Sequence, residues 1–131
     1  MTGELFCYYH LMSGAVLGID YGDKHIGLAV ATSPLAEPLT TINNSDFLVS
    51  IKKIISEHHI QSIVVGNCPE DFLAEISKLG LLVYQVDETL TTIDAAKALF
   101  HTTQSRRKSL IHAASAAIIL QSWLDSHLYN R

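Results

Sequence analysis

We predict an α/β fold for this chain: a mixed five-stranded sheet, made of an antiparallel β-meander followed by parallel strands and flanked by helices. Three short apolar runs follow one another between residues 15 and 42, and helical and strand-like patterns alternate after them. Apolar residues make up 48% of the 131 residues and charged residues 17%, which is typical of a protein with one packed core. We therefore expect a single domain over 15–131, preceded by a peripheral extension over 1–14.

Turn residues divide the predicted meander into three strands. Gly22-Asp23-Lys24 is typical of a tight hairpin turn, and Pro34 and Pro38 bound a longer loop. The apolar runs between these turns place the strands at Ala15–Tyr21, Ile26–Thr32 and Leu39–Ile42.

In the remainder of the chain, helical spacing of apolar residues alternates with short apolar runs. The last two strands are apolar on both faces, so we expect them to be central in the sheet. The expected elements are a helix from the Asn44-Ser45-Asp46 caps to about His59, a strand over Ser62–Gly66, a helix over Glu70–Leu79 that Gly80 ends, a strand over Leu81–Val86, a helix over 92–101 that Thr91 and Asp94 cap, and a last helix from Ser109 to about His127.

Charge and cysteine content limit the class of protein. The formal net charge is −4, which excludes nucleic-acid binding by bulk charge alone but leaves room for a local basic patch. Cys7 and Cys68 form no metal-binding or disulfide pattern, and the first ten residues lack the features of a secretory signal. No apolar run approaches the ~20 residues that a membrane span needs. These observations predict a cytoplasmic protein with no membrane partner.

Acidic residues close two of the predicted strands. Asp20 ends the first strand, and Asp87 and Glu88 follow the last one. Because a buried carboxylate needs a partner and ligands gather at strand ends, a divalent cation could neutralise these groups and activate water for phosphodiester hydrolysis. In the alternative, Asp20 is only a turn former, and Asp87 and Glu88 only compensate a helix dipole.

His112 is a second candidate, in the first turn of the last predicted helix. With Ser115, Ile119 and Trp123 it forms a stripe that should face the sheet. A helix N-terminus disfavours imidazolium, so the ring would be neutral and able to bind a metal. In the alternative, His112 is a hydrogen-bonded core histidine.

Basic residues lie close to both candidate groups. Arg106, Arg107 and Lys108 form the only dense basic run, immediately before the last helix, and Lys24 lies in the predicted turn after Asp20. These side chains could hold a phosphate backbone. The alternative for the basic run is a solvated loop.

Five motifs follow one another in order between residues 15 and 124. They are Gly18-Ile-Asp-Tyr-Gly22-x-Lys24-x-Ile26-Gly27-Leu-Ala-Val30, Ala36-x-Pro38-Leu39, Ile63-Val-Val-Gly66, Val86-Asp87-Glu88-x-Leu90-Thr91-Thr92 and Ala113-x-Ser115-Ala116-Ala117-x-x-Leu120-Gln121. In motif order and spacing the chain resembles the YqgF/RuvX family. Its members are Holliday junction resolvase-like nucleases associated with maturation of the 5′ end of pre-16S ribosomal RNA.

The resemblance implies an RNase H-like fold and hydrolysis of phosphodiesters with a divalent metal, Mg²⁺ or Mn²⁺. Carried over by position, Asp20 is the first metal carboxylate, and Asp87 or Glu88 is the second. His112 stands where the family has a third acid. Because neutral imidazole suits Mn²⁺ better than Mg²⁺, we expect a weaker or Mn²⁺-shifted activity.

Three further positions depart from the family pattern. Thr89 replaces an arginine, His25 replaces a basic residue, and the segment after Gly66 is shortened to Asn67-Cys-Pro-Glu-Asp71. Within that shortened segment, Glu70 or Asp71 could supply a further ligand.

The resemblance therefore implies a cytoplasmic, metal-dependent nuclease acting on structured RNA, in 5′-end processing of pre-16S ribosomal RNA. Asp20, Glu88 and His112 would hold the metal, assisted by Asp87. Lys24 and the basic run 106–108 would position the backbone. The expected partner is pre-rRNA or branched DNA, and the expected oligomeric state is a monomer or homodimer. The alternatives are a catalytically degenerate RNA-binding factor in ribosome assembly and a DNA Holliday junction resolvase.

Overall fold

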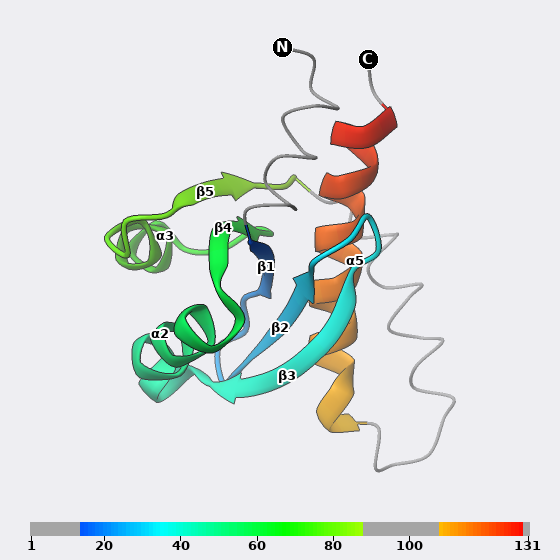
Figure 1. Cartoon of the computed structure of the whole chain (residues 1–131). Coiled ribbons are helices and arrows are strands. Elements are labelled where there is room, and N and C mark those ends of the chain that lie inside the picture. The colour runs from blue at the N-terminus through cyan, green and yellow to red at the C-terminus, as the bar shows by residue number, and fades with distance from the viewer. Residues whose placement is uncertain (1–13, 88–107, 130–131) are drawn as a thin grey trace.

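The computed structural model describes residues 14–87 and 108–129, and in these ranges it contains one mixed five-stranded sheet (Figure 1). The strand order is β3-β2-β1-β4-β5. β1 pairs antiparallel with β2 and parallel with β4, so the meander and the parallel strands share β1 as the middle strand. This confirms the predicted fold class. The strands are β1 (Ala15–Asp20), β2 (His25–Ala31), β3 (Glu37–Asn43), β4 (Ile60–Val65) and β5 (Leu82–Gln85).

Helices cover both faces of this sheet, and Figure 1 shows the long helix α5 on one side with α2 and α3 on the other. Each face has its own apolar cluster, because side chains alternate along the strands. None of the helices in the described ranges is long and apolar enough to cross a membrane. The helical elements are the 3₁₀ turn η1 (Asn44–Asp46), α2 (Phe47–His58), α3 (Glu70–Ser77) and α5 (Lys108–Tyr129).

The alternation in β1 decides which of its residues meet α5. Leu17 and Ile19 pack in the cluster under α2 and α3, whereas Val16 packs in the cluster under α5. On the α5 side, Ile119 and Trp123 are only 1% and 4% exposed, which confirms that this stripe faces the sheet. The α5 face is therefore the side of the sheet on which Asp20 is expected by alternation.

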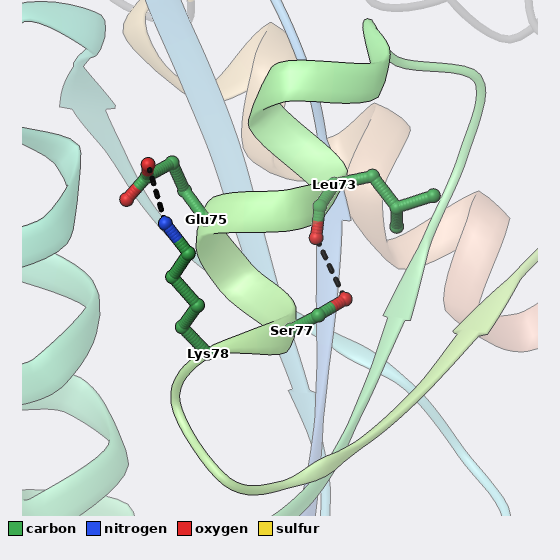
Figure 2. Close-up of polar contacts among 4 residues, drawn as sticks. All are labelled: Leu73, Glu75, Ser77 and Lys78. Carbon is green, nitrogen blue, oxygen red and sulfur yellow. Dashed lines mark hydrogen bonds and ion pairs between the residues drawn. The ribbon is translucent and has the colours of Figure 1, made fainter.

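The end of α3 lies two residues earlier than predicted. The Ser77 hydroxyl donates a hydrogen bond to the carbonyl oxygen of Leu73 at 2.7 Å, and the Lys78 ammonium lies 3.4 Å from the Glu75 carboxylate (Figure 2). Gly80 follows with a φ of 84°, a left-handed conformation that suits glycine. Gly80 thus follows the end of the helix, as expected, but after a short turn.

Two predicted strands differ from those observed. The third strand includes Pro38, which the sequence places in a loop. Pro38 is tolerated because β3 is an edge strand among those described and its pairing with β2 is irregular next to Pro38. The last strand, β5, is also at an edge of the described sheet and not central as predicted. Its Leu82 is 56% exposed, so the apolar character of this strand does not reflect burial on both faces.

The predicted helix caps also differ in detail. The Asn44 amide donates to the carbonyl oxygen of Gly22 at 2.7 Å and so ties η1 to the β1–β2 turn instead of capping α2. Asp46 is the N-cap of α2 but makes no side-chain capping hydrogen bond. α5 begins at Lys108, so Ser109 lies inside the helix. The predicted helix over 92–101 lies outside the described residues, as do residues 1–13 of the extension predicted over 1–14.

Ser62 gives a first prediction about stability. It is 0% exposed, and its hydroxyl has no hydrogen-bond partner among the described residues. Removing an unpaired buried hydroxyl relieves its desolvation cost, so Ser62→Ala is expected to raise the free energy of unfolding by about 1 kcal/mol. Urea denaturation measures this change. Ser115→Ala is the control, because the buried Ser115 hydroxyl donates to the Ile111 carbonyl at 3.1 Å and its loss should bring no gain. Equal or lower stability of Ser62→Ala contradicts the prediction.

Candidate functional site

Asp20 ends the middle strand of the sheet on the α5 face. It pairs with Gly27 of β2, and residues paired across antiparallel strands point to the same face. A Cβ built on Gly27 points straight at α5, which fixes the face for both residues. Asp20 is half-buried and has an interaction partner in the structure. The predicted strand-end carboxylate is therefore in place, on the side covered by α5.

The start of α5 lies against the backbone of β2 at this same corner. A Cβ at Gly27 would lie 1.8 Å from the carbonyl oxygen of His112, a distance that no real Cβ can occupy. Gly18 of β1 also faces α5, but less tightly, since its Cβ would lie 2.8 Å from the Leu120 Cβ and 3.0 Å from the Ala116 carbonyl oxygen. These two glycines let the helix approach both strands. As a result, His112 comes next to the pairing partner of Asp20, although the two residues are distant in the sequence.

The side chain of His112 contacts a second histidine. The rings of His25 and His112 stack with centroids 5.6 Å apart and an interplanar angle of 26°. His25 is the first residue of β2 and, two positions before Gly27, shares its face. The corner therefore holds one carboxylate and two imidazoles on the same side of the sheet.

Asp87 lies at the same end of the strands as Asp20, but one strand separates their backbones. The amide of Gly66 donates to the Ile19 carbonyl at 3.2 Å and that of Val86 donates to the Val65 carbonyl at 2.8 Å, so the carboxyl ends of β1, β4 and β5 are level. β4 lies between the other two strands, which separates their backbones by about 10 Å. Asp87 follows β5 as an exposed residue.

The described residues do not form a metal site by themselves. In 14–87 and 108–129, no three histidine, cysteine or acidic residues are grouped so as to hold a metal ion. Asp20 and His112 share a corner, while Glu88, the other predicted ligand, lies outside the described residues. A complete donor set thus needs at least one group from beyond them.

The other predicted site residues are placed as follows. Lys24 is exposed in the β1–β2 turn, close in the chain to Asp20. Arg106 and Arg107 lie outside the described residues, and Lys108 is the first residue of α5. Only Lys24 of the four predicted backbone-binding side chains can therefore be located.

Asp71, which the sequence suggested as a further ligand, lies elsewhere. Together with Tyr21 and Phe72 it lines a cavity of about 270 Å³. Tyr21 and Phe72 pack in the cluster under α2 and α3, with ring centroids 4.7 Å apart. Asp71 is thus associated with the face opposite α5. Its neighbour Glu70 is exposed in the first turn of α3.

The sequence pattern did not predict the roles of Gln121 and Gly27. Gln121 of α5 holds the β2–β3 loop, since its amide oxygen accepts from the Ala36 amide at 2.8 Å and its nitrogen donates to the Pro34 carbonyl at 3.0 Å. A glycine inside a strand, such as Gly27, is a recognised sign of close backbone approach and could have predicted where α5 crosses. Nothing in the pattern predicted the contact between His25 and His112.

Cys68 shows no sign of a catalytic role. It is a free, half-buried cysteine that follows β4 and packs against the cluster under α2 and α3. Burial raises the pKa of its thiol, which lowers the thiolate fraction at neutral pH. The raised pKa therefore argues against Cys68 as a nucleophile.

The sheet order, the helices on both faces and the acid that ends the middle strand define an RNase H-like fold of the resolvase type. Among solved structures, the chain is similar to the RuvC of T. thermophilus in complex with a Holliday junction substrate, with a TM-score of 0.55, 18% identity and coverage of 88% of this chain and 96% of that one. It is also similar to the Fowlpox virus resolvase in complex with Holliday junction DNA, with a TM-score of 0.57, 11% identity and coverage of 87% and 99%. At these identities the likeness concerns the fold.

The family model described as "RuvX: Holliday junction resolvase" matches residues 14–126, and the chain belongs to this family. Curated relatives carry the name "Putative pre-16S rRNA nuclease". The protein of this name from Dechloromonas aromatica is 34% identical, over 86% of this chain and 92% of its own length. That from Caldanaerobacter subterraneus is 33% identical, over 85% and 96%. The predicted family is thereby confirmed.

Proposed function

We propose that the protein is a cytoplasmic, metal-dependent nuclease that hydrolyses phosphodiesters of structured RNA in 5′-end processing of pre-16S ribosomal RNA. Membership of a nuclease family and the names of the curated relatives support this function. The observation that carries it is the meeting of Asp20 and the first turn of α5 at one corner of the sheet. The packing of α5 on the sheet brings two candidate ligands from distant parts of the chain to this corner.

In this proposal Asp20, Glu88 and His112 hold a divalent ion, Mg²⁺ or Mn²⁺, and Asp87 assists them. Tyr84 and Val86 pack on the α5 face, so alternation along the chain directs Asp87 away from that face. The alternation favours Glu88 over Asp87 as the second carboxylate. When bound, such an ion polarises the phosphate and lowers the pKa of a water molecule so that it can act as nucleophile.

The protein's own side chains hold and orient the substrate. Lys24 extends from the exposed β1–β2 turn next to Asp20, where an ammonium group can contact a phosphate oxygen. We assign the same role to the basic run of the sequence, Arg106, Arg107 and Lys108. Because the net charge is −4, this local positive charge is needed to bring a polyanion to the acidic corner.

The identity of residue 112 gives a test of the site. In His112→Asp a carboxylate replaces imidazole at the first turn of α5, and hard oxygen ligands suit Mg²⁺ better. We expect this variant to cleave a precursor 16S transcript faster in Mg²⁺ by about tenfold or more, and to lose any preference for Mn²⁺. The measurement is the initial rate of cleavage in each metal, with thermal unfolding as a check on folding. An unchanged ratio of Mn²⁺ to Mg²⁺ rates would show that residue 112 does not contact the ion.

Cleavage of a DNA four-way junction and of a precursor 16S transcript, measured side by side, shows which substrate the protein prefers. Branched DNA is the substrate that the family description favours.

A catalytically degenerate RNA-binding factor is the second candidate. It is favoured by His112, an imidazole at the position where the family has a third acid. Binding of the transcript without cleavage in either metal supports this candidate and overturns the proposed nuclease.

A further inference from the structure

The stacking of His25 of β2 on His112 of α5 is a contact to which the proposed metal site assigns no role. His25 is exposed at the first position of β2, whereas His112 is half-buried on α5. Their rings lie 5.6 Å apart and deviate from parallel by only 26°. An exposed side chain at the start of a strand normally samples several rotamers, so a near-parallel contact with a half-buried ring restricts both residues.

The contact with β2 involves the backbone of His112, whereas the contact with His25 involves its ring. The contact between the His112 carbonyl and Gly27 sets the position of the helix over β2. It does not set the rotation of the imidazole about its own side-chain bonds. His25 lies on the same face of β2 and contacts the flat side of that ring.

We propose that His25 is a positioning residue that holds the His112 imidazole at the Asp20 corner by ring stacking. The role depends on a flat ring at position 25 and not on a ring nitrogen. The expected effect on metal binding rests on the proposed function, in which His112 is a metal ligand. A ligand that is oriented before binding contributes more to affinity, since only the competent fraction of side-chain orientations can bind.

Two substitutions separate stacking from the other properties of His25. His25→Phe keeps a flat ring and removes both nitrogens, whereas His25→Ala removes the ring. His58→Ala is the matched control, because His58 lies in the last turn of α2 on the other side of the sheet. All three proteins are compared as full chains with the unaltered protein.

The first readout needs neither metal nor activity. Side-chain NMR spectra of the metal-free proteins report the His112 ring protons, whose chemical shifts are displaced by a neighbouring aromatic ring. We expect the displacement in the unaltered protein, in His25→Phe and in His58→Ala, and its loss in His25→Ala. Unchanged His112 signals in His25→Ala overturn the inference.

The second readout is Mn²⁺ binding, measured by calorimetry. We expect His25→Ala to weaken it by about three- to tenfold, and His25→Phe and His58→Ala to leave it within about twofold. If His25→Phe is as weak as His25→Ala, the nitrogen matters and the positioning role is wrong. If the NMR shifts follow the expected pattern but the unaltered protein binds no Mn²⁺, the metal function fails while the positioning of His112 is supported.

Discussion

Asp20→Asn is expected to abolish cleavage of structured RNA, lowering the rate by about a hundredfold or more while leaving the fold intact. Asparagine has the same size as aspartate, so packing at the end of β1 is kept. The negative charge is lost, and with it the strongest attraction for a divalent cation at this corner. The measurement is the rate of cleavage of a precursor 16S transcript in saturating Mn²⁺.

The control for this variant is Asp23→Asn in the β1–β2 turn. Asp23 is exposed and only three positions from Asp20, so the same loss of charge occurs close by but away from the end of the strand. We expect its cleavage rate to stay within about twofold of that of the unaltered protein, because exposed charges in water are strongly screened. Equal rates for Asp20→Asn and the unaltered protein would show that the proposed site is wrong.

Gly27→Ala should cause the largest loss of stability of any single methyl group added to the described sheet. The new Cβ would lie 1.8 Å from the carbonyl oxygen of His112 and 2.1 Å from its carbonyl carbon. Both atoms belong to the backbone of α5, so no rotamer change relieves the clash and the helix must move away from β2. We expect a loss of about 3 kcal/mol or more in the free energy of unfolding, measured by urea denaturation.

Gly66→Ala is the matched control, since Gly66 also lies beneath α5. There the new Cβ would lie 2.8 Å from the Cδ1 atom of Ile119, the far end of a flexible side chain. A change of rotamer can relieve this contact, so we expect Gly66→Ala to be clearly less destabilising. If the two variants lose equal stability, the close approach of α5 at Gly27 is not a special constraint on the fold.

The sequence was sufficient for the order of the elements and for the acid at the end of β1. Short-range patterns carry that information: the apolar run of β1, the turn at 22–24 and the apolar stripe of α5 are each local. The edge position of β5 was not predictable from Leu82, because apolar character does not show whether a neighbour covers it. Pro38 was assigned to a loop because its tolerance in β3 depends on the strand being at an edge, which is a property of the whole sheet.

The candidate site was predictable in its residues but not in its geometry. The motifs single out Asp20 and His112, and the structure brings their backbones to one corner. The stacking of His25 on His112 depends on where α5 crosses β2, which is a tertiary contact without a local pattern. The position of β4 between β1 and β5 is likewise a property of the whole sheet, so the spacing of Asp20 and Asp87 has no local pattern.

The docking of α5 has a consequence for how the chain folds during synthesis. α5 packs on β1 and β2, yet the ribosome makes it long after both strands have emerged. Until then the α5 side of the sheet, with Val16, Ala29 and Val64, lacks its cover. Such late, long-range contacts slow folding and leave apolar surface open to aggregation or to chaperones. The helix that brings His112 to Asp20 therefore also buries the apolar surface through which the nascent chain could aggregate.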